Sequence, residues 1–473
     1  MSTDLLARAK EARKNYRWTQ RLITKVHSDA RSNYQQQREI VANLFVGEWT
    51  KYLEDVGEEV HIRFRGGEGY VPREDIGNKR VLEIYFIDVG QGDSIIIQTA
   101  DDKRVLIDGG MDKSAHSFLQ WKYNLKKYHI VFDAVIMTHG DADHAGGLIS
   151  ILKDNHVLVK AIYHNGITKR QDNSLGEIAS SQEGDVLVDL YDDIEDLKPQ
   201  YSELKPLYQE WVDAVTKAKR RAERHKLDFK CVRADQNTER ISIGGEEGLQ
   251  IRFLGPINLG DEKSPRLKKF GDRWFVGKTL NGNSVSVLLE YGQARILLCG
   301  DMNEPAEKFF LRHWGEKSTR EKALQAHVFK ANHHGSKDFS SSFLSAVKPW
   351  VTVVSSGDFP DYGHPRACLL GSLGHYAPQE IDKPLLFSTE IAATFVPIPE
   401  SQLGETGRHV YEKNIHGMIH VRTDGNWLAA GRVYGRTQKK RRRGRLRRSI
   451  WKWEAYAFNL ANGRPLGNEL LAA

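Results

Sequence analysis

The sequence predicts a layered α/β fold, and three observations lead to that fold class. Short apolar and β-branched runs, such as VLEIYFIDV (81–89) and ARILLCGDM (294–302), are separated by Gly and Asp turns, which is typical of strands. The run HAGGLISILKDN (144–155) spaces its apolar residues as a helix does. Apolar residues make up 40% of the 473 positions, which is enough for a large core. Strands that alternate with helices indicate helices packed on sheets.

The first 80 residues differ from this pattern. Residues 4–55 have no proline and no glycine before Gly47, and they are rich in Ala, Leu, Arg, Lys, Gln and Glu. That composition predicts helices, and the length suits two of them. HIRFRGGEGYVP (61–72) alternates and turns, which predicts a small β element. We therefore expect residues 1–80 to form a helical N-terminal extension with a small β element.

The main domain is expected over residues 81–400. After VLEIYFIDV, the strand-like runs are SIIIQTA (94–100), KRVLIDGG (103–110), AVIM (134–137), VKAIYHNG (159–166), LQIRFLGP (249–256), SVSVLLEYG (284–292), ARILLCGDM, HVFKANHHGS (327–336) and PWVTVVSSGD (349–358). A helix is predicted from Glu304 to about Trp314.

Two segments stand apart from the main domain. Residues from about 165 to 248 combine an acidic part, EGDVLVDLYDDIEDLKP, with a helical part, YQEWVDAVTKAKRRAERHKL, and we interpret them as an insertion. Residues 401–473 are expected to form a β-hairpin, GMIHVRTDGNWLAAGR (417–432), followed by a basic tail and a C-terminal segment.

Charge and cysteine content limit the class of protein. The formal net charge of +7 is a modest excess that does not by itself imply a nucleic-acid partner. The three cysteines, Cys231, Cys299 and Cys368, are far apart and form no C-x-x-C pair, which fits a reducing compartment. The first residues lack the apolar core of a signal peptide, and no apolar run approaches the roughly 20 residues of a membrane span. We therefore expect a cytoplasmic protein with no membrane partner.

The stretch THGDADHAGG (138–147) concentrates four metal-ligating side chains after the apolar run 134–137, namely His139, Asp141, Asp143 and His144. In a loop that leaves a strand, a kinked backbone directs such side chains at two different ions, and the small residues between them permit the turn. The alternative is a polar N-cap turn, because Asp is a good cap and glycine favours turns.

Two later segments carry the same residue types after predicted strands. LLCGD ends at Asp301, and KANHHGSK holds His333 and His334. Taken alone, the first is typical of a turn and the second of solvent-facing histidines. Because sites gather at strand ends in α/β sheets, the three loops together predict a shared dinuclear metal site.

These motifs carry a resemblance. H-x-D-x-D-H (139–144) resembles the H-x-H-x-D-H motif of the metallo-β-lactamase superfamily. Together with FIDVGQGDS (86–94), LIDGG (106–110), NSVSVLLEYG (283–292), LLCGD, HHGSK (333–337) and YGHP (362–365), it is similar to the hydrolase domain of the ComEC family of competence proteins and its free-standing relatives. The similarity extends over about residues 81–390, apart from the insertion, and does not include the ComEC transmembrane channel.

The resemblance implies a fold and a ligand set. The fold is a four-layer αββα metallo-β-lactamase sandwich, here with the helical N-terminal extension, the charged helical insertion and the basic C-terminal tail. In the implied ligand set, His139 and Asp141 bind one ion, Asp143 and His144 bind the other, and Asp301 bridges them.

The same resemblance assigns further residues. One histidine of HHGS completes the second metal site, and we expect His333 there, with His334 as the alternative. Asp108 in LIDGG is expected to orient ligands without touching metal. The superfamily usually has a third histidine for the first ion, but Asn283 lies nearest that place and His164 is a distant substitute. We expect Asn283 to contact substrate.

Position 141 bears on the metal and the reaction. A carboxylate in place of an imidazole makes the first site richer in oxygen, which suits Mn²⁺ or Mg²⁺ as well as Zn²⁺. We expect two divalent ions as cofactors, Zn²⁺ or Mn²⁺, with Mg²⁺ as a further candidate. Paired ions stabilise the attacking and leaving oxygens of a phosphodiester, so Asp141 favours phosphodiester hydrolysis over β-lactam opening.

The expected mechanism is attack on phosphorus by a metal-bound hydroxide, because coordination lowers the pKa of water towards about 7. Asp143 is expected to ligate metal and to hold the nucleophile. His364 in YGHP is a candidate to protonate the leaving oxygen or contact phosphate, or else is a turn residue before Pro365. Ser336 and Lys337 are expected to hold phosphate, with simple exposure as the alternative.

The C-terminal region contains a dense basic run followed by aromatics. Residues 436–448 include nine basic side chains and no acid. The basic residues are Arg436, Lys439, Lys440, Arg441, Arg442, Arg443, Arg445, Arg447 and Arg448. Such density neutralises phosphates, and the nearby Trp451, Trp453 and Tyr456 offer stacking surfaces for unpaired bases. A solvated linker is the alternative.

The function expected from these observations is a dinuclear metal-dependent phosphodiesterase, specifically a nuclease acting on DNA more than on RNA. Two alternatives stay open: hydrolysis of a small phosphodiester or ester-like substrate such as a cyclic nucleotide, and a non-catalytic nucleic-acid-binding adaptor with a structural metal. The N-terminal helices are expected to bind a protein partner, to mediate self-association, or to pack on the core.

Overall fold

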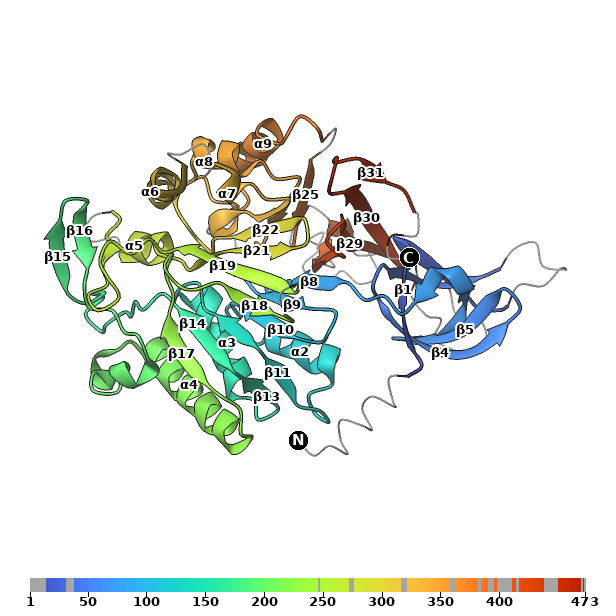
Figure 1. Cartoon of the computed structure of the whole chain (residues 1–473), viewed down its shortest axis with the longest axis horizontal. Helices are drawn as coiled ribbons and strands as arrows, with labels where there is room; N and C mark the ends of the chain where they lie inside the picture. Colours follow the sequence, from blue (N-terminus) through green and yellow to red (C-terminus); the bar gives the residue numbers. More distant parts are fainter. Residues whose placement is uncertain are drawn as a thin grey trace, which may run out of the picture. The chain divides into compact units, whose positions relative to one another are not determined.

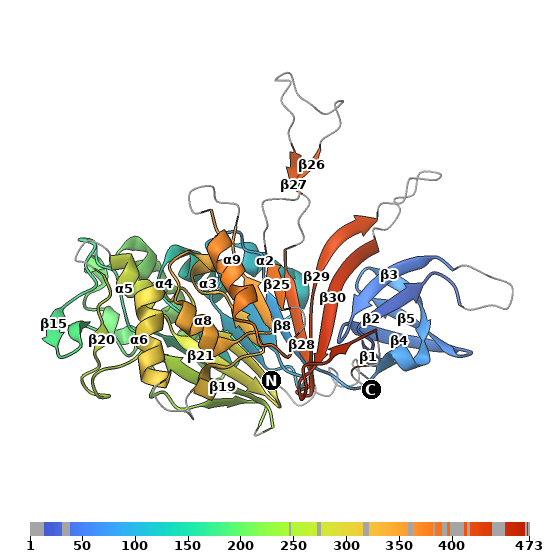
Figure 2. The same ribbon diagram turned by 90° about the horizontal axis from the view of Figure 1, so that it is seen from above.

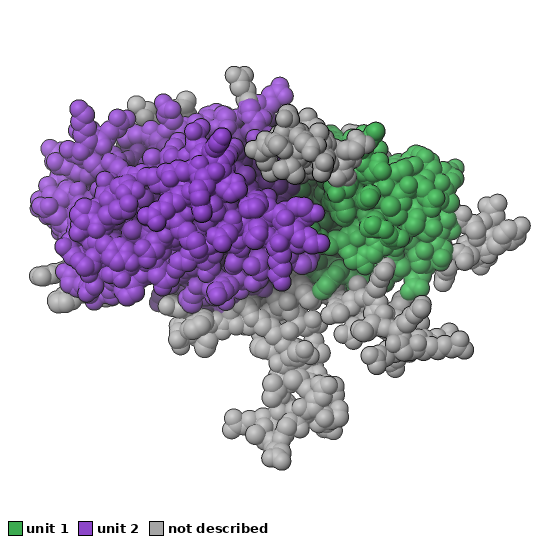
Figure 3. Space-filling model, turned by 90° about the horizontal axis from the view of Figure 1, so that it is seen from below, with its two compact units in different colours: residues 1–83, 393–473 green, residues 84–392 purple. Residues whose placement is uncertain are grey.

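The computed structural model describes residues 14–30, 38–245, 247–271, 276–315, 321–357, 363–381, 384–389, 395–397, 411–413, 417–437, 450–468 and 471. The chain divides into two compact units. One unit comprises residues 1–83 and 393–473, and the other comprises residues 84–392 (Figure 3). None of the described helices is long and apolar enough to cross a membrane.

The first unit contains an antiparallel sheet in the order β3-β2-β6-β5-β4-β1-β7. Its strands are β1 (Tyr16–Thr19), β2 (Ile23–His27), β3 (Ile40–Phe45), β4 (Trp49–Val56), β5 (Glu59–Phe64), β6 (Gly67–Pro72) and β7 (Ile76–Gly77). One face packs around Val26, Val60, Ile62, Phe64 and Val71.

The prediction of N-terminal helices is wrong for the described residues, where the chain forms strands from Tyr16 onward. In β2, Thr24 and Val26 are buried while Lys25 between them is exposed, which is the period of a half-buried strand. This burial pattern outweighs a helical composition, because propensity is a weak preference that tertiary packing overrides. Residues 1–13 and 31–37 lie outside the described residues. The expected partner binding or self-association through these helices therefore loses its basis.

The C-terminal strands of the first unit run in the order β28 (Ile419–Thr423), β29 (Trp427–Thr437), β30 (Ile450–Asn459) and β31 (Pro465–Leu466), all antiparallel. A separate pair, β26 (Phe395–Pro397) and β27 (Tyr411–Lys413), is also antiparallel. The hairpin predicted at 417–432 is present as β28 and β29. Phe45 stacks on Trp453 with ring centroids 4.9 Å apart, so the two ends of the chain share one core in this unit.

The basic run is not a terminal tail. Thr437 at the end of β29 pairs with Ile450 at the start of β30, so the run connects two antiparallel strands and its two ends lie side by side. Arg436 is a residue of strand β29. The other eight basic residues predicted to contact nucleic acid fall within 438–449, outside the described residues.

The two large sheets of the second unit form its core, beside the small sheets β11-β13 (Ile130–Phe132 and Val157–Val159) and β15-β16-β20 (Ile178–Ser181, Gly184–Leu187 and Leu267–Lys268). The strands of the first run in the order β17 (Lys230–Arg233), β14 (Ala161–His164), β12 (Ala134–Ile136), β10 (Arg104–Ile107), β9 (Ile95–Gln98) and β8 (Leu82–Phe86). The strands of the second run in the order β18 (Ile241–Ile243), β19 (Leu249–Gly255), β21 (Ser286–Tyr291), β22 (Ala294–Leu298), β23 (Val328–Lys330), β24 (Val351–Val354) and β25 (Leu385–Ser388). In the first sheet β10, β12, β14 and β17 are parallel, and in the second β22 to β25 are parallel.

Helices cover the outer face of each sheet. On the first sheet lie α2 (Ser114–Tyr123), α3 (Ala142–Lys153) and α4 (Pro206–Arg224) (Figure 1). On the second lie α6 (Glu304–Gly315), α7 (Glu321–Leu324), α8 (Ser341–Val347) and α9 (Ala367–His375), with α6, α8 and α9 side by side (Figure 2). Phe310 and Phe343 of these helices pack against Phe329 of β23 in one core. The layers are therefore α-β-β-α, which confirms the predicted fold class.

The segment interpreted as an insertion is only partly separate. Its acidic half forms β15 (Ile178–Ser181) and β16 (Gly184–Leu187), which pair with each other and with β20 (Leu267–Lys268). The predicted helix is present as α4, but Trp211 and Val215 bury it against the domain. Strand β17 then pairs with β14 and extends the first sheet. The apolar face of α4 thus makes this part of the segment integral to the sandwich.

Candidate metal centre

Three glycine-containing turns bring the motif-bearing loops together. Gly92, with φ of +121°, lies so close to Asp143 that a Cβ atom would stand 2.1 Å from the carbonyl oxygen of Asp143. A Cβ atom on Gly147 would stand 1.9 Å from the carbonyl oxygen of Gly109. Close backbone contacts that only glycine permits therefore hold three motifs together, namely FIDVGQGDS, LIDGG and THGDADHAGG.

The first turn of α3 holds part of the THGDADHAGG motif. We expected a loop up to His144, but the helix begins at Ala142, so Asp143 and His144 belong to its first turn. Asp141 occupies the N-cap position, yet its side chain makes no capping hydrogen bond. The capping alternative for Asp141 therefore fails, and its carboxylate is available to the site.

Three imidazole rings are oriented in the same way, with Nδ1 held by the protein and Nε2 facing the site. His144 Nδ1 donates to Asp108 Oδ2 at 2.8 Å, and His334 Nδ1 donates to the carbonyl oxygen of Ser355 at 2.9 Å. His139 Nδ1 lies 3.1 Å from Thr138 Oγ1. Fixing one ring nitrogen leaves the other free as a ligand, which is the usual arrangement of metal-bound histidine.

The ligand-facing atoms converge on Asp301. Its Oδ2 lies 2.9 Å from His334 Nε2 and 3.3 Å from His144 Nε2. Asp143 Oδ2 lies 3.3 Å from His334 Nε2. All four lie on segments that follow strand ends, after β12, β22 and β23, with Asp143 and His144 in the first turn of α3.

The structure places His334, the alternative, in this cluster instead of His333. Both residues adopt left-handed backbone conformations, with φ of 47° and 52°, in the short turn Asn332–Gly335. This turn directs His334 inward, and His334 is buried with 1% of its surface exposed. His333 instead lies with its ring centroid 5.9 Å from that of His364.

Two groups that sequence reasoning missed support the cluster. Asp93, in GQGDS, faces the Nδ1 side of both rings, with its carboxylate oxygens 3.5 Å from His334 Nδ1 and 4.0 Å from His144 Nδ1. Lys330, the last residue of β23, is buried and pairs with Asp93, and its ammonium lies 3.5 Å from Asp301 Oδ1. The quoted motif FIDVGQGDS contained Asp93, but a lysine in an apolar strand gave no signal. We name Asp93, His144, Asp301 and His334 the buried cluster.

His139 and Asp141 form a second, less enclosed part of the site, which we name the loop pair. His139 Nε2 lies 3.7 Å from Asp141 Oδ2. Asn281, with its amide nitrogen turned towards Asp141, lies 3.0 Å from that same oxygen. Tyr208 of α4 is buried with its hydroxyl against Gly140, so the segment interpreted as an insertion reaches the site.

Charge and burial shift the pKa values of the side chains in this site. Burial and the neighbouring Asp143 raise the pKa of Asp141 to about 6. Burial and His144 lower the pKa of His139 to about 3. Burial alone would lower the pKa of His144 and of His334, but the carboxylate of Asp301 and its neighbours raise both well above the ordinary value. Without metal, these two rings therefore hold protons that offset the carboxylates.

Other predicted residues lie outside this convergence. The amide nitrogen of Asn283 donates to the carbonyl oxygens of Lys268 and Thr279, so its role is structural and the expected substrate contact is not supported. Ser336 is buried and its hydroxyl accepts from the backbone N–H of Asp338, whereas Lys337 is exposed. His364 is half-buried, and burial and His333 lower its pKa to about 4. His164 stacks on Tyr191 in the core, with centroids 4.1 Å apart.

The donor set fits divalent metal ions. Imidazole nitrogens and carboxylate oxygens are the donors that Zn²⁺ and Mn²⁺ take in proteins. His139 Nε2 is buried and has no hydrogen-bond partner among the described residues, which leaves a ligand atom that needs one. The protons on His144 and His334 are those that a bound cation would displace.

Comparison with known proteins agrees with the motifs. Residues 87–226 match the model of the metallo-beta-lactamase superfamily. Recombination protein 2 of Haemophilus influenzae is 22% identical over 302 residues, covering 63% of this chain and 27% of that protein. ComE operon protein 3 of Bacillus subtilis is 23% identical over 312 residues, covering 62% and 31%. The chain thus spans less than a third of the length of these relatives, and the matches confirm the resemblance to ComEC-like metallo-β-lactamase domains.

Solved structures also show similarity. A diphosphatase from the PhnP family is 13% identical, with 58% of this chain and 85% of that chain covered and a TM-score of 0.27. A metallo-β-lactamase from Cronobacter sakazakii is 12% identical, with 53% and 74% covered and a TM-score of 0.26.

Proposed function

We propose that this chain is a metal-dependent phosphodiesterase and that its substrate is nucleic acid, DNA in preference to RNA. One observation carries the proposal. The Nε2 atoms of His144 and His334 and the carboxylates of Asp143 and Asp301 meet in a buried site, with contacts of 2.9 to 3.3 Å, although they come from three segments that follow different strands. The loop pair lies beside them, joined by His139 and His144, whose ring centroids are 4.1 Å apart.

The proposed ligands divide between two divalent ions. His139 and Asp141 would hold one ion, Asp143, His144 and His334 would hold the other, and Asp301 would contribute to both. When bound, such ions supply a water of lowered pKa and stabilise the charge on the attacking and leaving oxygens.

The chain's own residues prepare this site. Asp108 accepts from the backbone N–H and hydroxyl of Thr138 as well as from His144, so it fixes the ring that faces the site. Lys330 offsets the charge of Asp301 from the inside of the domain. Asp143, in the first turn of α3, has the exposure needed to meet substrate, with 20% of its side chain accessible.

The preference for a phosphodiester rests on Asp141. A carboxylate there adds oxygen ligands and suits harder ions, which pair well with phosphate oxygens. The choice of nucleic acid is supported by the name of the relative Recombination protein 2 and by the basic run 436–448. Because that run joins two paired strands, we propose that it contacts phosphates as a hairpin connection.

His364 is proposed as a group that meets the leaving oxygen or a substrate phosphate. Its ring lies near that of His333, which belongs to the same turn, Asn332–Gly335, as His334. His364→Ala should change the pH–rate profile if the imidazole transfers a proton. An unchanged profile and rate would remove it from the reaction.

The decisive experiment measures cleavage of labelled single- and double-stranded DNA and RNA with Mn²⁺, Mg²⁺ or Zn²⁺. The variants are Asp143→Ala and a surface control, Asp228→Asn, both checked for folding. We expect metal-dependent cutting that Asp143→Ala abolishes and Asp228→Asn retains. Hydrolysis of a cyclic dinucleotide without cutting of polymers would replace nuclease by small-substrate phosphodiesterase, and metal-independent binding without turnover would favour an adaptor.

A further inference from the structure

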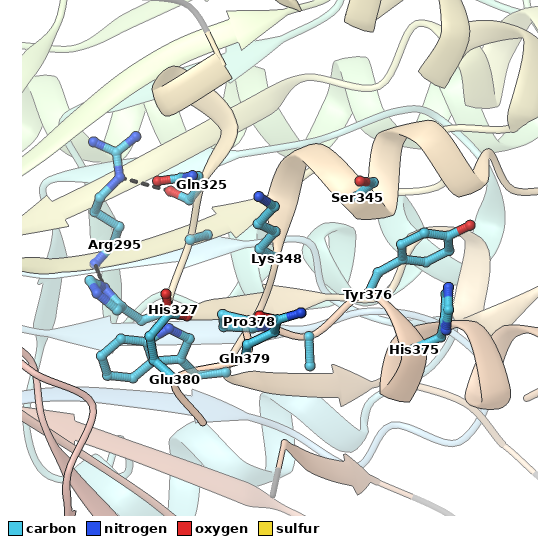
Figure 4. A pocket seen from close by; sticks show the side chains of 13 residues that line it. Arg295, Gln325, His327, Ser345, Lys348, His375, Tyr376, Pro378, Gln379 and Glu380 are labelled. Carbon is cyan, nitrogen blue, oxygen red and sulfur yellow. Dashed lines mark hydrogen bonds between the residues drawn. The ribbon is translucent and has the colours of Figure 1, made fainter. Parts of the chain in front are cut away.

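A cavity of about 660 Å³ lies in the second unit, away from the metal centre. It is lined by His327 and Trp350, which precede β23 and β24, and by side chains that follow α8 and α9 (Figure 4). His334 of the buried cluster follows the other end of β23. The cavity and the metal centre thus lie at opposite ends of the strands of the same sheet.

A second cavity of about 790 Å³ adjoins the first. The two share Gln325, Ser345, Lys348 and Tyr376 in their walls. The second cavity extends along α6 to Lys308 and Arg312, which lie on one face of that helix because they are four residues apart. We name the combined cavity the helix groove.

The helix groove is cationic. The basic residues in its walls are Arg295, Lys308, Arg312 and Lys348, whereas the described wall residues include a single carboxylate, Glu380. Arg295 is engaged by Glu290 and by the carbonyl oxygen of Gln325. Lys308 pairs with Glu304 on the helix surface, and an exposed pair of this kind is weak.

Two of these cations are available to a ligand. Arg312 and Lys348 are exposed and form no ion pair within the described part of the chain, and the guanidinium of Arg312 lies over the Phe309 ring, 5.4 Å from its centroid. They come from α6 and from the residue after α8, so they flank the groove from different elements. An anion with more than one charge would meet both.

Aromatic rings line the same groove. Tyr376 is half-buried, and the ring of the neighbouring His375 lies 4.7 Å from it at a steep angle. Trp350 packs edge-on against His327, with centroids 4.5 Å apart. Cations beside aromatic rings are the combination that binds unpaired nucleotides, because phosphates meet the charges and bases stack on the rings.

We propose that the helix groove binds single-stranded nucleic acid, with phosphates against Lys308, Arg312 and Lys348 and a base against Tyr376. An extended strand suits the groove better than a single nucleotide does, because its cations are spread over two adjoining cavities. The inference rests on the proposed function only for the choice of nucleic acid as the polyanion. Since the groove lies away from the metal centre, it would anchor a strand independently of the reaction.

The test measures the affinity of the full chain for a labelled DNA strand of about 20 nucleotides. A chelator removes metal, so that binding is separated from cleavage. The double variant Arg312→Glu/Lys348→Glu is compared with Lys126→Glu/Lys127→Glu, which makes the same change in net charge at two exposed lysines outside the groove. Tyr376→Ala is compared with Tyr376→Phe, which keeps the stacking ring.

We expect the groove variant to bind at least about tenfold more weakly at roughly 100 mM salt, and the salt slope to fall by about 0.7 for each lost phosphate contact. The control pair should change affinity by less than about threefold. Tyr376→Ala should weaken binding several-fold, and Tyr376→Phe should not.

Three results would overturn the proposal: equal losses in both charge-reversal pairs, wild-type affinity in the groove variant, or full competition by a mononucleotide at millimolar concentration. The last would make the groove a nucleotide pocket. If the wild type binds through the groove but cuts nothing with any metal, the proposed nuclease fails while the groove assignment stands.

Discussion

The buried cluster and the loop pair use the same residue types but are held differently. In the buried cluster every ligand-facing side chain has a partner behind it: Asp108 for His144, the carbonyl of Ser355 for His334, and Lys330 for Asp301. In the loop pair, the amide of Asn281 is the one group among the described residues at hydrogen-bond distance from the carboxylate of Asp141. For the proposed metal centre, the comparison indicates that one half is prebuilt and that the other half is completed by its ion.

The largest expected difference concerns the metal ions themselves. Asp301→Asn should remove tight binding of both ions and lower cleavage by at least about a thousandfold, because it removes the ligand that we propose serves both ions. Asp141→Asn should leave the ion at the buried cluster in place. Metal content after dialysis, measured by mass spectrometry beside the cleavage rate, checks both. Loss of both ions in Asp141→Asn would show that the two halves are not distinct.

The buried lysine provides the next test. Lys330→Met should lower the free energy of unfolding by about 3–5 kcal/mol without metal, since it removes the buried ammonium that pairs with Asp93 and lies near Asp301. Lys169, half-buried near Asp141, is the matched position at the loop pair. Lys169→Met should cost less than about 1 kcal/mol. Similar losses in urea unfolding would contradict the difference in burial.

The same contrast separates what the sequence predicted from what it did not. The sequence predicts that His139, Asp141, Asp143, His144 and Asp301 lie close together, because each follows an apolar run and the ends of parallel strands meet at one side of a sheet. The layered fold followed from the same alternation. These features are local in sequence and therefore visible in it.

The supporting residues were not visible, because their roles depend on distant partners. In the sequence, Lys330 is simply part of an apolar strand. Its role depends on Asp93, which is far away in the chain and pairs with Lys330 only in the folded structure. The choice of His334 depends on a left-handed turn that composition does not encode. The N-terminal strands were missed because alternating burial, a tertiary property, outweighed helical composition.

Support behind the rings gives a smaller, graded effect. Asp108→Asn should weaken metal binding about 10–100-fold, because it loosens the ring orientation of His144. Ser284→Ala removes the hydroxyl 3.4 Å from His139 Nδ1 at the loop pair. We expect a change of less than about threefold there, since Thr138 also faces that nitrogen. Metal titration of both variants ranks the two supports, and the reverse ranking would count against the prebuilt cluster.

The outermost support of the buried cluster predicts a pH effect. Glu307 of α6 is buried, and its carboxylate accepts from the amide of Asn332, at 2.7 Å, and from the backbone N–H of Ser340. Asn332 begins the turn that directs His334 inward. Burial raises the pKa of Glu307 from 4.5 to about 8. The folded chain therefore holds a proton there that the unfolded chain releases above pH 4.5.

The sign follows from that difference. Between pH 4.5 and about 8 the folded state binds more protons at Glu307 than the unfolded state, so this group lowers stability as pH rises, by up to about 1.4 kcal/mol per pH unit. Glu307→Gln, which cannot titrate, should flatten the fall in unfolding free energy between pH 5 and 8 in metal-free protein. His144 and His334 contribute in the same direction, but they are present in both proteins, so the difference isolates Glu307. Identical slopes would mean that Glu307 is ionised in the folded state, and the turn behind His334 would then be held by a charge.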